Sequence, residues 1–326
     1  QLFSELNDKT LAFNVAVGHI NGTWGEMLYE LNELDEAHRY AKKGVEHLEQ
    51  GHDVSHLGYR YSCLAKILCS KRDLAGAEGI VPKMDELMLT STIPPWVLTR
   101  IKAVKALILL MKGSIDSLAK WVTECGLKLS DEPTWQHDAE QIMFARILIA
   151  QNRFDDALEL LNRLIAENEK SGRVLNQIET LVLKALALNK LNKETESVDA
   201  VKKALKLAEP GGYVRVFVDE GQPMAELLEK MLDAKADIPR AFVKKILSDF
   251  KLRQLEKNDY GLIEPLSDRE LEVLRFIAAG LSNKKITEQL FVSMSTVKTH
   301  LRNIYGKLDV HSRTEAIVKA RDIGLL

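Results

Sequence analysis

The sequence predicts an all-α protein in which a long helical-repeat array is followed by a small four-helix module. Two observations predict this fold. An apolar pattern recurs at intervals of 39 to 41 residues over roughly the first 210 positions, which is typical of stacked helical repeats. Over about the last sixty residues, helix caps and helix stops follow one another at short intervals. A chain of 326 residues that is 46% hydrophobic is long enough for two or more domains.

Four short segments mark the repeat. They read ELDEA at 33–37, DLAGA at 73–77, SIDSL at 114–118 and RFDDA at 153–157. Their second residues are Leu34, Leu74, Ile115 and Phe154, and the residues three positions on are Ala37, Ala77, Leu118 and Ala157. A weaker fifth copy begins near Glu194. We interpret each copy as a pair of helices that cross closely at the small residue. Because no single pair can bury its own apolar face, the pairs are expected to stack into a tetratricopeptide-like solenoid.

The pattern breaks after the array, at Pro210, Gly211 and Gly212. The next residues, YVRVFV at 213–218, are rich enough in β-branched residues for a strand, but a helix is favoured because no strand partner is nearby. Residues 239–257 predict a basic amphipathic helix, and residues 258–265 predict a linker. The expected domains are therefore a helical-repeat domain at 1–238, an amphipathic helix and linker at 239–262, and the C-terminal module at 263–326.

From Ser267 onward, residues that typically begin and end helices occur at short intervals. Ser267 and Glu270 have the S-x-x-E spacing of a capping box, and Gly280 is expected to end that helix. The next three helices are predicted to begin at caps formed by Ser282, Ser293 and Ser312. Short helices joined by tight turns indicate a helix-turn-helix arrangement.

The third of these helices, STVKTHLRNIYGKL at 295–308, is amphipathic. Its apolar residues Val297, Leu301, Ile304, Tyr305 and Leu308 share one face, while Ser295, Thr299, Arg302, Asn303 and Gly306 lie opposite, with Lys298 on the flank. An isolated helix of this kind is most often an ordinary solvated surface. Between Ser282 and Arg313, however, six Lys and Arg residues face two acids, a local charge of +4 in a chain whose net charge is −2. Concentrated positive charge in an acidic chain favours a polyanion partner, and such a helix fits the major groove of DNA.

Residues 266–317 closely resemble the LuxR-type helix-turn-helix. The blocks LSDRELEVL, GLSNKKI, STVKTH and NIYGKLDV match the pattern of that family. Upstream, LAEPGGYVRVFVDEGQPM at 207–224 and the helical repeats resemble the C-terminal half of the large MalT-like regulators. No G-x-x-x-x-G-K-[ST] motif for ATP is present. The ATP-binding switch domain that such regulators usually carry was therefore either removed or never present. Because the chain begins at Gln1 in helix-like sequence, it is expected to be a fragment or processed form of something longer.

The resemblance implies which side chains touch double-stranded DNA. Base contacts fall on Lys298, Thr299 and Arg302. Phosphate contacts fall on Ser282, Asn283, Lys284, Ser295, Thr296, Lys307 and Arg313. A homodimer on two half-sites is implied, with the last helix at the two-fold axis and with Ala316, Ile317 and Ala320 as its contact residues.

Two functional hypotheses follow from these expectations. In the first, the chain is a cytoplasmic bacterial transcriptional regulator whose repeat domain senses a small ligand or a protein, with RNA polymerase as a further possible partner. Trp24, Tyr29, Tyr59, Trp96 and Trp135 are candidates for a ligand groove, although core packing is the competing interpretation. In the second, the chain is a protein-binding scaffold with a secondary DNA-binding module. A salt titration of DNA binding distinguishes the two.

Other chemistry finds little support in the sequence. Cys63, Cys69 and Cys125 form neither a C-x-x-C pair nor a disulfide framework, which predicts reduced thiols. His38, His47, His52 and His56 cluster loosely, but no cysteine or acid completes a set with ligand spacing. No G-x-S-x-G nucleophile motif and no membrane-spanning apolar run is present. We therefore expect neither an enzyme, nor a cofactor or metal in this chain, nor a membrane partner.

Overall fold

The computed structural model describes residues 2–51, 53–234, 236–258, 266–290 and 292–322. These residues form helices, turns and loops without a strand, so the predicted all-α class is confirmed. The chain divides into two compact units, Gln1–Leu247 and Ser248–Leu326, and each is described by itself.

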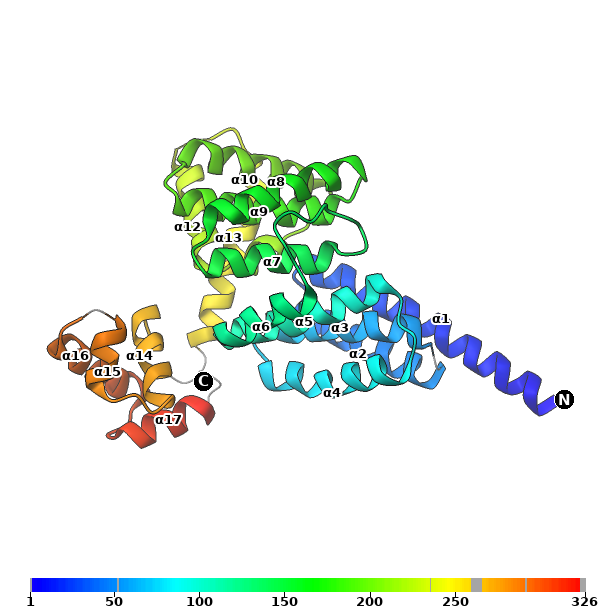
Figure 1. The fold of residues 1–326 in the computed structure, drawn as a ribbon, viewed down its shortest axis with the longest axis horizontal. Coiled ribbons are helices and arrows are strands. Elements are labelled where there is room, and N and C mark those ends of the chain that lie inside the picture. The colour runs from blue at the N-terminus through cyan, green and yellow to red at the C-terminus, as the bar shows by residue number, and fades with distance from the viewer. Residues whose placement is uncertain (1, 52, 235, 259–265, 291, 323–326) are drawn as a thin grey trace. The chain divides into compact units, whose positions relative to one another are not determined.

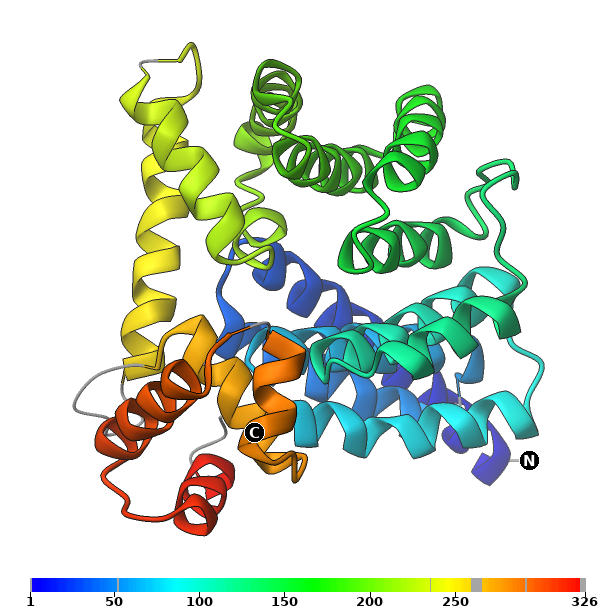
Figure 2. The same ribbon diagram turned by 60° about the vertical axis from the view of Figure 1, so that its left-hand side comes forward.

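Ten helices of the first unit pair as five antiparallel hairpins (Figure 1). The hairpins are α1 (Leu2–Glu30) with α2 (Leu34–Gly51), α3 (Val54–Ser70) with α4 (Leu74–Thr90), α5 (Pro95–Met111) with α6 (Ile115–Cys125), α7 (Asp138–Ala150) with α8 (Phe154–Lys170), and α9 (Val174–Lys190) with α10 (Glu194–Ala208). Figure 2 shows the blue-to-cyan hairpins as one layer and the green hairpins turned over it, so the array is curved. The predicted solenoid is confirmed.

The landmarks of the repeat have one structural meaning. Leu34, Leu74, Ile115 and Phe154 are each the first residue of the second helix of a hairpin, and Glu194 has the same place in the fifth. The residue two positions before each landmark has a positive φ, because the tight turn needs a left-handed residue there. These residues are Asn32, Arg72, Gly113, Asn152 and Asn192, with φ between 58° and 69°.

Small residues sit where the two helices of a hairpin cross. Ala37, Ala77 and Ala157 have no exposed surface, and Leu118 is 1% exposed. The backbones of α1 and α2 approach each other closely at glycines. A Cβ atom added to Gly25 would lie 2.8 Å from the backbone nitrogen of Ala41, so only glycine fits there. Close helix approach explains why the pattern requires a small residue at this position.

The segment after the array is helical, as favoured from the sequence. It forms α11 (Arg215–Val218), which contacts both α1 and α9. The backbone N–H of Val214 donates to the carbonyl oxygen of Glu30 at 2.9 Å. The side chain of Arg215, 1% exposed, donates to Asn32 at 2.7 Å and pairs with Asp219. A segment near residue 215 therefore closes the array onto its own first repeat.

Two further helices follow, α12 (Gln222–Asp233) and α13 (Arg240–Asn258). The latter is the predicted amphipathic helix, and its apolar residues Phe242, Val243, Ile246, Leu247 and Phe250 are buried. Residues 259–265 of the predicted linker lie outside the described residues.

Beyond the end of α13, the described residues of the second unit form four short helices, α14 (Asp268–Ala278), α15 (Asn283–Leu290), α16 (Met294–Leu308) and α17 (Arg313–Asp322). The capping box of Ser267 and Glu270 is present, Gly280 has a φ of +79°, and Ser293 caps α16. Residues from all four helices build one core, among them Leu274, Ile286, Leu301 and Ala316. Nowhere in the described part of the chain is a helix both long enough and apolar enough to span a bilayer.

Candidate nucleic-acid interface

The helix α16 is held rigidly from both its ends and its apolar face. The hydroxyl of Ser293 accepts a hydrogen bond from the backbone N–H of Thr296 at 3.1 Å, which satisfies an N-terminal donor. Val297 and Ile304 have no exposed surface, and Leu301 and Leu308 are buried beside them. Asp309 ends the helix in the left-handed conformation, with a φ of 52°. Capped and packed in this way, α16 presents its other face in a defined orientation.

The outward face of α16 carries the three residues predicted to contact bases. Lys298, Thr299 and Arg302 are all exposed. The hydroxyl of Thr299 donates to the carbonyl oxygen of Ser295 at 3.0 Å. Within the described residues, no acidic group lies at salt-bridge distance from Lys298 or Arg302. Both cationic groups are therefore available to a ligand, and Arg in particular can pair bidentately with guanine.

The helix α15 adds a second exposed group of side chains. Ser282, Lys284 and Lys285 are exposed, while Asn283 is half-buried. The hydroxyl of Ser282 accepts from the backbone N–H of Lys285 at 3.4 Å, as expected for its predicted cap. At the start of α16, the hydroxyl of Ser293 lies 2.6 Å from that of Ser295 and 2.8 Å from that of Thr296. The N-termini of α15 and α16 thus carry hydroxyls and lysines, which is chemistry suited to phosphates.

Two predicted phosphate contacts have internal partners in this structure. The Lys307 ammonium lies 2.9 Å from the Glu270 carboxylate, and the Lys307 side chain is only 17% exposed. The guanidinium of Arg313 donates to the carbonyl oxygens of Ile277 at 3.0 Å and Leu281 at 2.7 Å. Both side chains hold the four-helix core together. Lys307 and Arg313 therefore have a structural role, and their predicted phosphate contacts stay a prediction.

The predicted dimer contacts are also partly revised. Ala316 and Ala320 have no exposed surface and belong to the core of the second unit, so their side chains cannot meet a partner. Ile317 is half-buried against the same core. The exposed apolar residue on α17 is Val318, at 53%.

The five aromatic residues proposed for a ligand groove do not form one surface. Tyr29 is buried, and its hydroxyl donates to Asp219 and lies 3.2 Å from that of Ser70, so this member of the set is wrong. Tyr59 and Trp96 pack together at 5.6 Å between ring centroids. Trp135 is exposed in the loop after α6. Trp24 lines a hollow of about 590 Å³ with residues such as Thr23, Met27 and Tyr40.

Sequence reasoning missed the role of Glu270 in positioning α16. Its carboxylate accepts from the backbone N–H of Ser267 at 2.8 Å and also pairs with Lys307, so one group ties α14 to α16. Burial raises the pKa of Glu270, but the hydrogen bonds from Ser267 and the pairing with Lys307 outweigh burial, and the net pKa is lowered. The cap was readable from the S-x-x-E spacing. The ion pair between Lys307 and Glu270 joins residues 37 positions apart, so no short-range sequence pattern predicts it.

Comparison with known proteins agrees with this geometry. Residues 264–320 match the luxR family of bacterial regulatory proteins, and residues 3–234, most of the chain, match the MalT-like TPR region. The chain belongs to the MalT-like regulators of the LuxR family. Its C-terminal match is to a family of bacterial regulatory proteins, and its relatives include HTH-type transcriptional regulators named MalT.

Several relatives share this organisation. The HTH-type transcriptional regulator MalT of Vibrio campbellii is 29% identical over 324 residues, and its counterpart in Vibrio parahaemolyticus is 28% identical over 325. MalT of Yersinia pestis is 28% identical over 318 residues. In each case the match covers 91% of this MalT-like chain and 35% of the relative. The chain thus spans about a third of the length of these relatives.

Proposed function

We propose that this MalT-like regulator reads a specific DNA site through the exposed face of α16. The observation that carries the proposal is the pair Lys298 and Arg302, exposed and free of acidic partners among the described residues, on a helix capped by Ser293. Lys284 and the hydroxyls at the starts of α15 and α16 would bind the flanking phosphates. These protein side chains suffice for the proposed contacts without a cofactor. Because its target is bacterial DNA, we place its action in the cytoplasm.

Substitutions at α16 test this proposal. A binding site is first selected from a pool of random duplexes with the unaltered chain. Lys298→Ala or Arg302→Ala should then cost about 1–3 kcal/mol at the selected site and relax base preference there. Lys284→Ala should instead weaken binding to selected and random duplexes alike and reduce the salt slope by about one. Fluorescence anisotropy with labelled duplexes measures both effects.

The matched control is Lys120→Ala in α6, which removes an exposed lysine from the repeat array. It should leave duplex binding unchanged. If Lys298→Ala and Arg302→Ala bind both duplexes as the parent does, α16 is not the recognition helix. If the parent shows no salt-dependent duplex binding at all, the scaffold hypothesis replaces the regulator.

We also propose that the regulator binds DNA as a dimer, through the exposed face of α17. Val318 is the exposed apolar side chain there, and burying it against a second copy is favourable. Val318→Asp should reduce cooperative binding to two half-sites one helical turn apart, while binding to a single half-site is retained. Analytical ultracentrifugation with duplexes carrying one or two half-sites measures this. Equal two-site cooperativity in variant and parent would rule out this face.

The repeat array is proposed to sense an effector, either a small molecule or a protein. The support is its curved stack of hairpins, since such arrays commonly bind ligands on an extended surface, together with the hollow beside Trp24. Mass spectrometry of the protein purified from its native host should detect a small molecule at a fixed ratio to the chain. Trp24→Ala should lower that ratio if the hollow is the site. Co-purification of a protein, with no small molecule, would indicate that the effector is a protein.

A further inference from the structure

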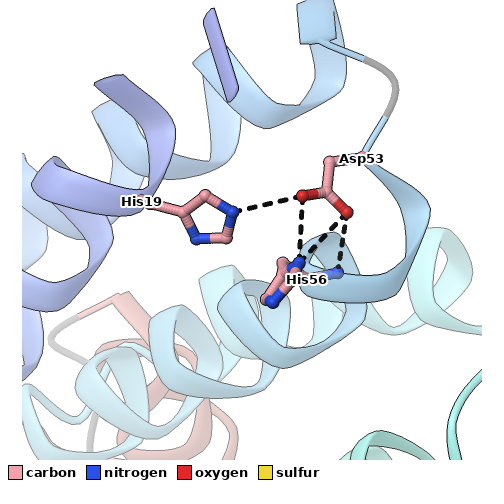
Figure 3. A group of neighbouring side chains, drawn as sticks. All are labelled: His19, Asp53 and His56. Atoms are coloured by element: carbon pink, nitrogen blue, oxygen red, sulfur yellow. Dashed lines mark hydrogen bonds and ion pairs between the residues drawn. The ribbon is translucent and has the colours of Figure 1, made fainter. Parts of the chain in front are cut away.

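Three side chains from two repeats converge near the start of α3 (Figure 3). His19 lies on α1, Asp53 is the N-cap of α3, and His56 lies in the first turn of α3. The Nε2 atom of His19 is 3.2 Å from Asp53 Oδ2, and the Nδ1 atom of His56 is 2.9 Å from the same oxygen. The three ligand atoms all lie within 4.8 Å of one another.

We propose that His19, Asp53 and His56 form a binding site for a divalent transition-metal ion, with zinc as its best-suited occupant. Two imidazoles and one carboxylate are a donor set that zinc uses, with water in the remaining position. Metal-to-ligand bonds of about 2.0–2.1 Å in a tetrahedron place neighbouring ligand atoms roughly 3.3 Å apart. The two oxygen–nitrogen distances already approach that value. The two imidazole nitrogens lie within 4.8 Å of each other, so they would have to come closer to bind one ion.

The carboxylate of Asp53 can bind a metal without giving up its structural role. Its Oδ1 accepts a hydrogen bond from the backbone N–H of His56 at 3.2 Å, which caps the helix. Its Oδ2 faces the two imidazole nitrogens. A metal bound at Oδ2 would replace the imidazole protons and leave the cap intact.

Helix capping alone does not account for the two histidines. Asp73 caps α4 in the same manner, accepting from the backbone N–H of Gly76 at 2.8 Å, and no histidine pairs with it among the described residues. The two imidazole rings meet edge to face, with centroids 4.3 Å apart. His19 lies 34 residues before Asp53 and on another helix, so the local cap of α3 does not explain its contact with Asp53.

The surroundings suit a bound cation. The Asp53 carboxylate is half-buried and lies within hydrogen-bond distance of both imidazoles, so its oxygen already faces the two nitrogens. The cation that contacts His19 is Arg60, and its charge is balanced by Glu26 at 2.9 Å. The side chains of His19, Asp53 and His56 are 32%, 17% and 43% exposed, so an ion can enter. The ring of His56 also packs against Trp96, which restricts its orientation.

Such an ion would fasten α1 to α3 and thereby join the first two hairpins. Sequence reasoning considered His38, His47, His52 and His56 as ligands and found no completing acid. The structure brings a different set together, because Asp53 lies at a helix start and His19 arrives from another helix. Only His56 is common to the two sets.

The test is zinc titration of the full chain after chelator treatment, followed by calorimetry and by thermal melting. The parent should bind one zinc ion with micromolar or tighter affinity, and zinc should raise its melting temperature. His19→Gln and His56→Asn place an amide donor near each replaced nitrogen, so the hydrogen bonds to Asp53 can persist while the metal ligand is lost. Each variant should bind zinc at least tenfold more weakly and lose the rise in melting temperature.

The matched control is His137→Asn. His137 also pairs with a carboxylate, Glu140 at 3.2 Å, but in the described residues this pair has no third ligand. It should bind zinc as the parent does, and magnesium should not substitute for zinc in any of these proteins. Zinc binding that is absent from the parent, or unchanged in both His19→Gln and His56→Asn, would overturn the proposal.

Discussion

At the scale of single residues, a cation's function in this regulator depends on its partner. Lys298 and Arg302 have no acidic partner among the described residues, whereas Lys307 is held by Glu270 and Arg313 by two backbone carbonyls. All four were equally plausible DNA contacts from the sequence. Charge alone therefore does not identify a nucleic-acid contact, because a cation already paired inside the domain must break that pairing to bind elsewhere.

Lys307→Ala should chiefly destabilise the helix-turn-helix domain. Removing the ammonium takes the charge partner from the buried Glu270 carboxylate, which keeps its hydrogen bonds from Ser267, at a cost of about 1.5–3 kcal/mol. Chemical denaturation followed by far-ultraviolet circular dichroism measures this loss. Lys285→Ala, which removes an exposed lysine on α15, should leave stability nearly unchanged. If Lys307→Ala and Lys285→Ala are equally stable, the pairing of Lys307 with Glu270 does not stabilise the domain.

At the scale of elements, the short helix α11 and the residues beside it join hairpins that are far apart in the sequence. Arg215 of α11 donates to Asn32 in the turn after α1, and Glu220, which follows α11, pairs at 2.7 Å with Arg146 of α7. The first and the fourth hairpins are thus joined through one short segment. Helical arrays otherwise hold only neighbouring repeats together, so α11 adds a long-range closure to the array.

Arg215→Ala should weaken this closure strongly. The guanidinium is nearly inaccessible, and its loss removes the ion pair with the half-buried Asp219 and the hydrogen bond to Asn32, at a cost of about 1.5–3 kcal/mol. Urea denaturation of the full chain should show earlier unfolding of the array and a broader transition. Arg39→Ala, which breaks the exposed pair with Glu36, serves as the control and should have little effect. If Arg215→Ala and Arg39→Ala lower the stability of the array by the same small amount, α11 does not hold the distant hairpins together.

At the scale of the whole molecule, charge is distributed unevenly along the chain. The net charge is −2, yet the stretch from Ser282 to Arg313 carries +4. Acidic groups accordingly prevail elsewhere, and several of them gather inside the array. Glu30, Glu179 and Glu220 are there, together with Arg146 and Lys66. Positive charge for DNA and a buried acidic network for closure occupy different parts of one sequence.

The buried network should make stability of the array depend on pH. Burial raises the pKa of Glu30 to about 7, against the opposing influence of Lys66. Between about pH 4.5 and 7 the folded state then holds a proton that the unfolded state releases, so the free energy of unfolding falls as pH rises through this window. Glu30→Gln should remove on the order of 3 kcal/mol of that fall. Denaturation at a series of pH values, with Glu33→Gln as an exposed control, measures it. A parent and variant with parallel pH profiles would contradict this assignment.

Short-range patterns in the sequence determined most of the fold. The period of the small residues located all five hairpins, and the serine and glutamate spacings located the caps of α14 and α16. These features depend on residues within one or two helical turns, so they are legible without knowledge of distant partners. The outward face of α16 was predictable for the same reason.

Only the tertiary structure decided which polar groups meet. Lys307 with Glu270, Arg215 with Asn32, and His19 with Asp53 are separated by 37, 183 and 34 residues respectively. Tertiary packing likewise placed Ala316 and Tyr29 in the interior, where the sequence allowed a surface role. The physical reason is that helical periodicity specifies which face of a helix is buried, whereas the partner of each side chain depends on how separate helices stack.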